Sequence, residues 1–425
     1  MRASPDPEGL DLMPLRRRAA LVAAAATTLT ALTAPIALAD TTAPTATATA
    51  TPSRADLYGT ADPTYDGVWR QSYAEIAVAR SGYFAGAPAT AWLLAQQCAD
   101  GGWPSYRKDT AKACDPKTED TNATGIAIQA LRIVQSSQSG GAVDRATAWL
   151  HSVQNADGGW SYNPGGPSDP DSTAVVMGAL GREAGLAPNA KGKSPYDALL
   201  GFQFGCDAAP ADRGAFGYPG TDGKLTPNAK ATADAVHFLA EAHLAGYAYA
   251  SPSTPAAPPK AADCTANPKA YAALDPNAAA SAAAGWLLAR LHAGGGHLTA
   301  VTPGATTKTP DYGTTADAVI ALNALGRFDD TKATSSWLGA ESAAWSKGNP
   351  AALAQLTLAG ADRTGALRQL IALGPAPTKR PTGAISKADE KDSSSNGSTW
   401  IIVGVVFVAS AGVGLLISGR KRRQR

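Results

Sequence analysis

Two carboxylates that could share a proton are separated by a single residue in the segment Asp169-Pro170-Asp171-Ser172-Thr173. Clustered carboxyl groups raise one another's pKa, because each negative charge disfavours the next, so one of them can stay protonated near neutral pH. An acid of this kind can protonate a substrate. Both aspartates could instead cap the start of a helix in a proline-containing turn. We take Asp171 and Asp169 as the candidate catalytic residues if the chain is an enzyme.

The spacing around Asp169 recurs along the chain. An Asp or Asn is followed four residues later by a Thr at Asp120–Thr124, Asp169–Thr173, Asn228–Thr232 and Asp311–Thr315. Asp and Asn side chains accept hydrogen bonds from the free N–H groups of a helix N-terminus, and an aspartate also suits the helix dipole. Each copy therefore predicts the start of a helix.

Candidate ligand-binding residues lie in or beside these predicted helix starts. Asp234 and Asp317 come two residues after a Thr, inside the first helical turn, where a carboxylate favours the dipole and would also point near a cavity. His237 and Tyr312 are candidates of the same kind. The full set of candidates is Asp120, Thr124, Thr173, Asp234, His237, Asp311, Tyr312, Asp317 and Trp160.

The sequence contains no metal-binding pattern. Its five histidines form no H-x-x-x-H pair, and its four cysteines form no C-x-x-C pair. Structural and catalytic zinc sites commonly draw their ligands from closely spaced residues of these types. We therefore predict no metal and no cofactor.

A repeated heptapeptide indicates the elements that position the candidates. Gln-x-Ala-Asp-Gly-Gly-Trp occurs at residues 97–103 and 154–160, with a degenerate copy near 294–297 and a weaker one near 214–218. Each copy follows a helix-like segment, and its glycines can end that helix by adopting positive φ. The tryptophan either packs between helices or forms the floor of a pocket. The repeat thus indicates a helix, a glycine-rich turn and a second helix.

Helical patterning predicts six helix hairpins, and because few Val/Ile alternations occur, no sheet is expected. The predicted helices span residues 66–81, 87–98, 121–135, 143–153, 171–185, 194–204, 228–245, 275–292, 314–327, 334–345, 349–360 and 363–373. A repeat of roughly 50 residues built from helix pairs is typical of an array or a closed toroid.

The heptapeptide and the helix starts resemble the "QW" repeats of the terpenoid cyclase and protein prenyltransferase (squalene cyclase-like) superfamily, whose fold is an (α/α)6 toroid. The resemblance covers most of residues 60–374 and is faint after Gly339. In that superfamily the aromatic and Gln of each motif tie neighbouring helices together, and the inner-helix N-termini surround the mouth of a central cavity. The resemblance implies an all-α chain with a single (α/α)6 toroid.

The segment that starts at Asp169 is similar to the D-x-D-D-T-A motif of class II terpene cyclases, in which the middle Asp protonates an alkene. The resemblance places Asp171 at the acid and Asp169 at the first carboxylate, whereas Ser172 replaces the third. Cyclases of that class usually have a second helical domain, which this chain is predicted to lack. The prenyltransferase branch implies a zinc set of Asp, Cys and His that the sequence also lacks.

A third branch comprises the cobalamin carriers intrinsic factor and transcobalamin, which are secreted, disulfide-linked single barrels. Their inner helices begin with Asp-Thr-Ala-type sequences similar to those at Asp171, Asp234 and Asp317. They hold a large amphipathic ligand at the barrel mouth and complete the site with a C-terminal β-domain. Because this chain is predicted to lack such a domain, a corrinoid would need a lid from a second chain.

Sequence patterns at both ends predict export and membrane anchoring. The predicted organisation is a signal peptide at 1–39, a Thr/Ala/Pro-rich spacer at 40–55, the toroid at 56–374, a disordered stalk at 375–399, a transmembrane helix at 400–418 and a basic cytoplasmic tail at 419–425. The toroid would therefore lie on the extracytoplasmic side of the cell membrane.

The cysteines and the charge fit an exported domain. Four cysteines in an exported chain predict two disulfides, and three connectivities are possible. We favour Cys98–Cys114 and Cys206–Cys264, because each would staple a long loop. The formal net charge of +2 gives no indication of nucleic-acid binding.

The sequence therefore favours a membrane-anchored toroid that binds a large amphipathic ligand, such as a corrinoid, for uptake rather than turnover. A membrane transporter or a second chain that supplies a lid is the expected partner. An enzyme, either terpene cyclase-like or active on polysaccharides through paired carboxylates, is the first alternative. A structural or protein-interaction module is the second.

Overall fold

The computed structural model describes residues 54–134, 139–181, 187–240, 258–301 and 307–379. The chain divides into two compact units, residues 1–50 and 51–425, and every described residue belongs to the second unit. The predicted signal peptide, transmembrane helix and cytoplasmic tail lie outside the described residues. Of the predicted spacer only the last two residues are described, and of the predicted stalk only the first five. Within the described ranges, no helix is both long and apolar enough to cross a bilayer.

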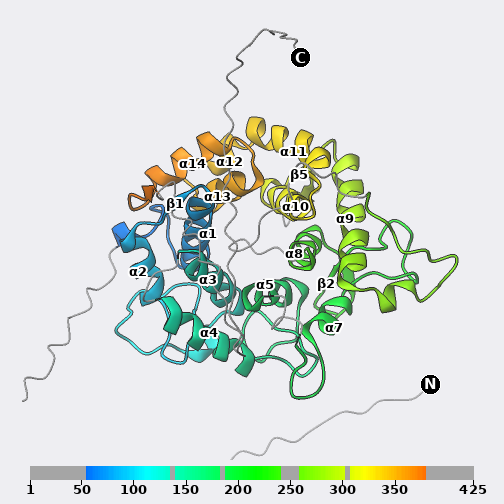
Figure 1. Cartoon of the computed structure of the whole chain (residues 1–425), viewed down its shortest axis with the longest axis horizontal. Helices are drawn as coiled ribbons and strands as arrows, with labels where there is room; N and C mark the ends of the chain where they lie inside the picture. Colours follow the sequence, from blue (N-terminus) through cyan, green and yellow to red (C-terminus); the bar gives the residue numbers. More distant parts are fainter. Residues whose placement is uncertain (1–53, 135–138, 182–186, 241–257, 302–306, 380–425) are drawn as a thin grey trace, which may run out of the picture. The chain divides into compact units, whose positions relative to one another are not determined.

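Six of the described helices form an inner set in which each contacts the next and the last contacts the first. In chain order they are α1 (Gly67–Arg80), α3 (Thr121–Val134), α5 (Pro170–Leu180), α8 (Ala229–Leu239), α10 (Tyr312–Ala324) and α13 (Pro350–Ala359). Figure 1 shows them around the centre of this unit. Most of their residues are buried, so they supply the core.

Each inner helix packs against an outer helix that lies next to it in the chain. The outer helices are α2 (Ala87–Ala95), α4 (Ser139–Ser152), α7 (Pro195–Leu200), α9 (Pro276–Ala293), α11 (Phe328–Glu341) and α14 (Arg363–Ala372). A short helix, α12 (Ala343–Ser346), also contacts α13. Short 3-10 turns lie at Arg54–Asp56, Pro116–Thr118 and Ala270–Ala273. The expected alternation of helix pairs is therefore present, and the chain is helix-rich as an all-α protein should be.

Several helix ends differ from the prediction. α4 begins four residues before the predicted position, at Ser139. α7 ends at Leu200, four residues early, where the chain turns at Gly201. α11 begins at Phe328 rather than at residue 334, because Asp329 and Asp330 place negative charge in its first turn.

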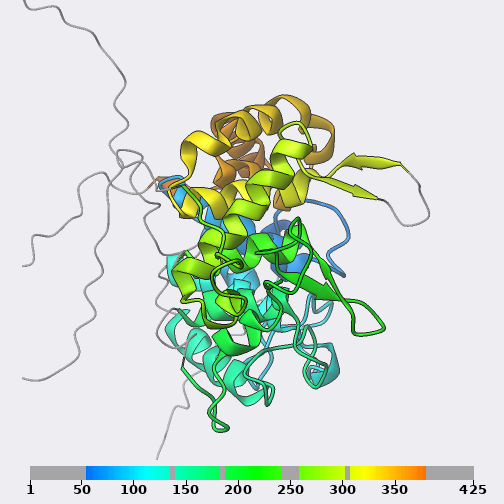
Figure 2. The ribbon, with the colours of Figure 1, turned by 90° about the vertical axis from the view of Figure 1, so that its right-hand side faces the viewer.

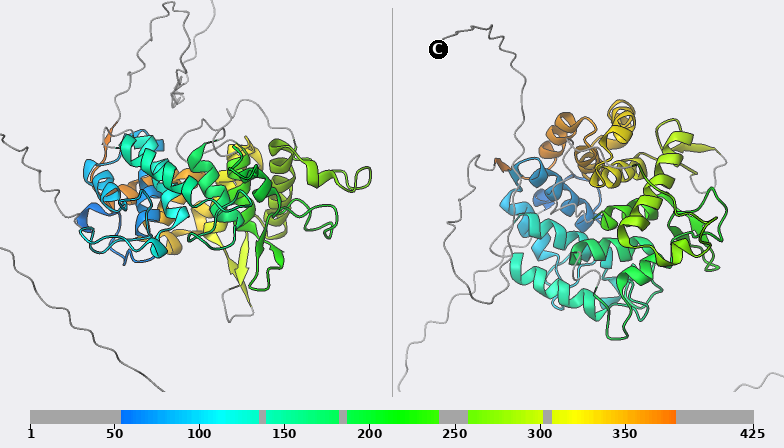
Figure 3. Two further views of the ribbon diagram at one scale, coloured as in Figure 1. Left: turned by 90° about the horizontal axis from the view of Figure 1, so that it is seen from below. Right: turned by 45° about the vertical axis from the view of Figure 1, so that its right-hand side comes forward.

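The expectation that no sheet forms is wrong for three two-stranded antiparallel pairs. These are β1 (Tyr83–Phe84) with β6 (Thr378–Lys379), β2 (Gly217–Pro219) with β3 (Leu225–Pro227), and β4 (Thr299–Val301) with β5 (Lys308–Pro310). Strands of two or three residues are too short to show an alternating pattern in sequence. The β2–β3 and β4–β5 hairpins extend from the same end of the inner helices (Figure 2; Figure 3, left).

The tryptophans of the heptapeptide pack between helices rather than forming a pocket floor. Trp103 and Trp160 are fully buried. The indole Nε1 of Trp103 donates to the carbonyl oxygen of Leu93 at 2.9 Å, and that of Trp160 donates to the carbonyl oxygen of Leu150 at 2.8 Å. Each tryptophan therefore ties the glycine-rich turn to the helix before it, in the same way in both repeats.

The threonine of each Asp/Asn-x-x-x-Thr copy links the inner helix to the turn that precedes it. The Thr124 hydroxyl accepts from the backbone N–H of Trp103 at 2.9 Å, and the Thr173 hydroxyl accepts from that of Trp160 at 3.1 Å. Thr232 and Thr315 accept at 3.0 Å from the corresponding N–H groups in their repeats. Because an unpaired buried N–H is costly, this hydroxyl explains why the threonine recurs.

Gly101 and Gly158 are required by the fold at the turn. Both have positive φ, +114° and +96° respectively. A Cβ at either position would lie 2.4 Å from a backbone oxygen, that of Arg145 for Gly101 and that of Ser194 for Gly158. The turn therefore needs a residue without a side chain for both conformation and space.

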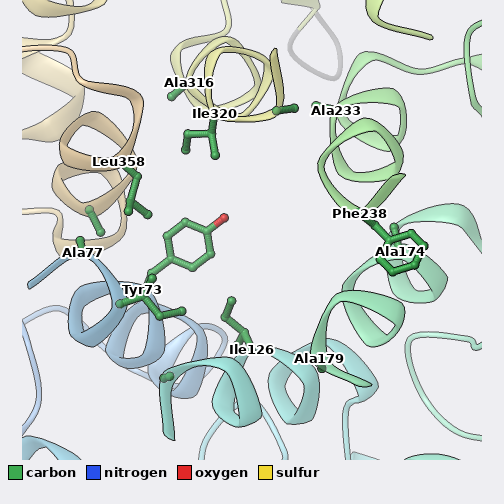
Figure 4. Packing of buried hydrophobic residues seen from close by; sticks show 14 of the residues in the cluster. Tyr73, Ala77, Ile126, Ala174, Ala179, Ala233, Phe238, Ala316, Ile320 and Leu358 are labelled. Atoms are coloured by element: carbon green, nitrogen blue, oxygen red, sulfur yellow. The ribbon is translucent and has the colours of Figure 1, made fainter. Parts of the chain in front are cut away.

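The core extends to the centre of the inner helices. Tyr73, Ile126, Ile320 and Leu358 come from four different inner helices and point toward one another (Figure 4). Both favoured disulfides, Cys98–Cys114 and Cys206–Cys264, are present and confirm the predicted pairing.

Candidate active site

Asp169 serves as the N-cap of α5. One carboxylate oxygen accepts from the backbone N–H of Ser172 at 2.8 Å, and the other accepts from the Ser172 hydroxyl at 2.7 Å. Burial raises the pKa of Asp169, and the hydrogen bonds from Ser172 oppose that rise. Ser172, which stands where a third carboxylate was expected, therefore stabilises the charge of Asp169 instead of repelling it.

Asp171 is the residue of this segment whose carboxyl group is available for chemistry, because it is not used in capping the helix. It lies in the first turn of α5, and its Oδ1 is buried without a hydrogen-bond partner among the described residues. Burial raises the pKa of Asp171 to about 6; Lys230 opposes this rise, whereas Asp169 and Asp317 add to it. The side chain is thus an acid whose proton affinity is well above that of an ordinary aspartate.

Lys230 supplies positive charge beside this acid. Its ammonium Nζ lies 2.6 Å from Oδ1 of Asp234 and 3.6 Å from Oδ2 of Asp317. Burial lowers the pKa of Lys230, but Asp234, Asp317 and Asp171 raise it further, so the net shift is upward and the ammonium stays charged. The lysine therefore forms ion pairs with carboxylates on α8 and α10, and its charge also acts on Asp171 of α5.

Asp234 and Asp317 hold the other carboxylates of this group. Burial raises the pKa of Asp234 to about 7; Lys230 opposes the rise, and Asp171 and Asp317 add to it. Asp317 is 8% exposed, and its Oδ1 accepts from Nε2 of Gln355 on α13 at 2.7 Å. We call Asp171, Lys230, Asp234 and Asp317 the central cluster.

The charge balance of the central cluster favours a bound proton near neutral pH. Three carboxylates face one ammonium, so full ionisation would leave an excess of negative charge in a largely buried region. Burial accordingly raises the pKa of Asp171 to about 6 and that of Asp234 to about 7. The cluster can therefore deliver a proton to a group placed beside it.

A small cavity adjoins the cluster at Asp234. It measures about 40 Å3, and its walls come mainly from Trp69, Tyr73, Ile126 and Phe238, together with His237. That volume is close to the space of one or two water molecules, whereas drug-sized ligands occupy several hundred Å3. The walls are aromatic and aliphatic, so the cavity offers an apolar surface next to an acid.

The structure brings only some of the predicted site residues together. Asp171, Asp234 and Asp317 belong to the central cluster, and His237 lines the adjoining cavity. Tyr312 instead stacks on Trp337, with ring centroids 5.2 Å apart.

The remaining candidates have structural roles at the helix starts. Asp120 caps α3 by accepting from the backbone N–H of Ala123 at 2.9 Å, and Asp311 caps α10 by accepting from that of Thr314 at 2.9 Å. Thr124, Thr173 and Trp160 make the hydrogen bonds of the turns given above. These five side chains hold the scaffold rather than contribute to the central cluster.

Sequence reasoning missed Lys230 and Gln355. Lys230 stands two residues after the cap Asn228, just as Asp171 stands two residues after the cap Asp169. Aligning the four helix starts by their caps would have placed Lys230 beside Asp171. Gln355 has no such signal, because it comes from α13, whose start lacks the Asp/Asn-x-x-x-Thr spacing.

A possible metal-ligand group occurs in one place among the described residues. It consists of Cys98, Cys114 and Glu119. The two cysteines form a disulfide, and metals bind the thiolate form. This group therefore offers a single carboxylate in the present state.

Comparisons with known proteins connect part of the chain to terpenoid cyclases. One stretch of 41 residues is 56% identical to a drimenyl diphosphate synthase of Streptantibioticus cattleyicolor, and it covers 10% of this chain and 8% of that protein. A second drimenyl diphosphate synthase, from Streptomyces showdoensis, is 28% identical over 27% of this chain and 29% of that protein. The chain thus spans less than a third of the length of these relatives. No family model matches.

Two solved structures are also similar. A protein from Actinoplanes has a TM-score of 0.42 and 17% identity, covering 74% of this chain and 92% of that one. A sugar epimerase from a ruminal bacterium has a TM-score of 0.38 and 14% identity, covering 66% of this chain and 77% of that one. The sequence matches support the terpenoid cyclase resemblance, and they favour it over the predicted likeness to the cobalamin carriers.

Proposed function

We propose that this chain is a terpene cyclase-like protein in which Asp171 protonates a carbon–carbon double bond of an isoprenoid. The carrying observation is the Asp171 carboxyl group: the residue is half-buried, its Oδ1 is buried without a hydrogen-bond partner among the described residues, and it belongs to a cluster that favours a bound proton near neutral pH. The similarity to drimenyl diphosphate synthases supports the same reading. The relatives are matched over a small part of their length, so activity and substrate are part of the proposal.

We also propose that the fold is the (α/α)6 toroid of this superfamily. The closed cycle of inner-helix contacts supports it, as does the pairing of each inner helix with an outer one. In such an arrangement the N-termini of α5, α8 and α10 meet at one end, which would explain why side chains from three separate helices reach Lys230. The missing third carboxylate of the linear motif would then be replaced by Asp234 and Asp317.

The proposed chemistry is a proton-initiated cyclisation. The π electrons of the alkene form a bond to the Asp171 proton, which leaves a carboxylate on Asp171 and a tertiary carbocation on the substrate. The π electrons of the next double bond then close a ring, and loss of a proton from the final cation restores an alkene. Lys230 would stabilise the carboxylate that forms, and the faces of Trp69, Tyr73 and Phe238 would stabilise the cation.

Binding of an isoprenoid would require the cavity to enlarge. Its volume of about 40 Å3 is much smaller than such a chain. The proposal therefore includes movement of the lining side chains when substrate enters, a common feature of sites that exclude water during reaction.

The test is turnover of isoprenoids by the full chain. Farnesyl diphosphate and squalene are offered as a charged and an uncharged linear probe, and products are identified by gas chromatography and mass spectrometry after removal of any diphosphate. We expect a cyclic isomer from one probe, and a loss of at least about 10³-fold in rate for Asp171→Asn, because the amide cannot donate the proton. Asp311→Asn is the matched control, because it changes a cap outside the cluster and should retain turnover.

Two outcomes would contradict the proposal. The first is that neither probe is converted under any condition in which the protein is folded. The second is that Asp171→Asn turns over substrate as fast as the wild type, which would place the acid elsewhere.

Binding without turnover is the second candidate function. Two observations favour it. The ion pairs of Lys230 with Asp234 and Asp317 partly neutralise the carboxylates of the central cluster, and Ser172 stands where the cyclase motif has its third carboxylate. Corrinoids and polyprenols are the probes for a large amphipathic ligand, and glycans test the polysaccharide alternative. A rise in melting temperature with one class and no product would favour this candidate. No shift with any class would leave the interaction module.

Export and membrane anchoring remain predictions from the sequence.

A further inference from the structure

We propose a second binding site, formed by α4 and the chain before α3, that holds an organic cation: an ammonium or guanidinium group on an apolar stem. The site is separate from the central cluster and does not rest on the function proposed for that cluster. Its defining residues are Asp100, Glu119 and Trp149, which line one cavity.

The cavity has room for a small ligand and two kinds of wall. Its volume is about 450 Å3, within the usual range for ligand sites. Asp100 and Glu119 provide two carboxylates, whereas Pro116, Pro164 and the buried Trp149 provide apolar surface. No lysine or arginine is among the residues that line it. The cavity therefore combines an excess of negative charge with an aromatic face.

Glu119 is the feature that indicates a ligand. It is only 1% exposed, and neither of its carboxylate oxygens has a hydrogen-bond partner among the described residues. Burial raises the pKa of Glu119 to about 7; the neighbouring Asp100 carboxyl group adds to that rise, whereas the Trp149 side chain and, less strongly, Arg107 oppose it. Arg107 does not neutralise it by contact, since its guanidinium donates to the carbonyl oxygens of Gln97 and Thr110, each at 2.8 Å.

The second repeat shows that the fold does not need a carboxyl group at this position. Ser168 occupies the position in the second repeat that Glu119 occupies in the first. A Cβ added to Gly102 would lie 2.7 Å from the Glu119 side chain, and a Cβ added to the equivalent Gly159 would lie 2.7 Å from the Ser168 side chain. The Ser168 hydroxyl donates to Asp157 at 2.8 Å, so that pair is satisfied internally. A buried polar group without a partner costs free energy. A serine at this position would avoid that cost, as Ser168 does in the second repeat. Glu119 is therefore best explained by a partner from outside the chain.

An organic cation suits this site better than a metal ion. Calcium requires six to eight oxygen ligands and magnesium close to an octahedron, but the oxygen-bearing side chains that line the cavity are Asp100, Glu119 and Ser152. An ammonium or guanidinium group can bond both carboxylates, while its stem contacts the prolines and the Trp149 ring. The disulfide Cys98–Cys114 fixes the loop over this region, with sulfur atoms within 4.8 Å of a Glu119 oxygen.

The test measures binding of simple cations to the full chain by isothermal titration calorimetry. The probes are n-pentylamine and n-butylguanidine, with n-pentanol as the neutral analogue and CaCl2 as the inorganic cation. At pH 8 we expect saturable binding of at least one organic cation and none of n-pentanol. At pH 5.5 the affinity should fall roughly tenfold or more, because Glu119, with a pKa of about 7, becomes protonated and loses its charge.

Two variants separate binding from folding. Glu119→Ser should abolish binding while the melting temperature stays level or rises, because the introduced hydroxyl can donate to Asp100 as Ser168 does to Asp157. Ser168→Ala in the second repeat is the matched control and should leave the affinity unchanged. Glu119→Gln keeps the side-chain volume and should also lose binding.

Several results would overturn the proposal. Binding of the organic cations that is equally strong in Glu119→Ser would place them elsewhere. Equal binding of n-pentanol would show that charge plays no part, and binding of CaCl2 alone would identify a metal site instead. The absence of binding by both organic probes up to millimolar concentration would exclude the site.

Discussion

The first and second repeats share a backbone but differ in one buried side chain. In both, a glycine-rich turn is fixed by a tryptophan that donates to the preceding helix and by a threonine hydroxyl from the following one. In the second repeat, Asp157 accepts from Ser168, and the pair is satisfied. In the first, Asp100 faces Glu119, and the carboxyl group of Glu119 is left without a partner among the described residues. The difference separates what the scaffold requires from what a ligand would require.

The central cluster shows the same distinction at the inner-helix starts. Asp169 and Asp171 are separated by a single residue, yet Asp169 accepts two hydrogen bonds from Ser172 and acts as a cap. Asp171 has an oxygen with no partner among the described residues, and the charge of Lys230 opposes the rise of its pKa. Neighbouring residues of one type therefore divide into a structural and a chemical role, according to whether the local backbone uses their oxygens.

The largest expected effect tests whether the two turns are equivalent. Gly101→Ala and Gly158→Ala should each lower the free energy of unfolding by about 2–4 kcal/mol, because the new Cβ would meet a backbone oxygen at 2.4 Å and the residue would keep positive φ. Urea unfolding followed by circular dichroism measures the change. Gly165→Ala is the control, since its φ is also positive but no atom lies within 4 Å of the added Cβ; a loss of about 1 kcal/mol is expected there. Equal losses at all three sites would show that close packing at the turns is unimportant.

A smaller effect should come from converting the first repeat to the chemistry of the second. Glu119→Ser should raise the free energy of unfolding by about 1–3 kcal/mol at pH 8 and by much less at pH 4.5. The measurement is urea unfolding of both proteins across this pH range.

The sign follows from the direction of the pKa shift. The folded-state pKa of Glu119, about 7, lies above the ordinary value of 4.5. The folded protein therefore retains a proton that the unfolded chain releases, and stability contributed by this proton is lost as pH rises from 4.5 through 7. A stability difference between the two proteins that does not change with pH would contradict the buried, unpartnered state of Glu119.

The smallest expected effect concerns the glutamines that begin the two repeats. Nε2 of Gln97 donates to the carbonyl oxygens of Gly101 and Ala142, whereas Nε2 of Gln154 donates to that of Gly158. Gln97→Leu should therefore cost about 1–2 kcal/mol, and Gln154→Leu about 0.5–1 kcal/mol. Thermal unfolding of the two variants in parallel measures the difference. A larger loss for Gln154→Leu would mean that the bond between helices contributes little.

Much of the scaffold could be predicted from the sequence because its signals are local. Asp169, Asn228 and Asp311 mark helix starts, since a short polar side chain can reach the N–H groups only two or three residues ahead. Helix ends were less certain, and α4, α7 and α11 begin or end up to six residues away from prediction. The short strands gave no periodic signal, so the three strand pairs were missed.

The candidate site was predicted less well, because the same residue type serves two purposes. Asp120 and Asp311 share the spacing of Asp169 and prove to be caps, whereas Asp234 and Asp317 share a later position and meet at Lys230. Spacing within one helix places a side chain on a face, but it does not tell which other helix lies opposite.

The sequence by itself determined the helix pairs, the caps, the turns that require glycine and the residue types available for chemistry. These depend on interactions over a few residues, and they recur wherever the motif recurs. Only the tertiary structure decided that Asp171, Lys230 and Asp317 form one cluster while Asp169 does not. That outcome depends on the packing of α8 against both α5 and α10, which brings together residues almost 150 positions apart and removes water from their charges. Proximity and burial of this kind set the proton affinity of the site, and neither is encoded in any single stretch of the chain.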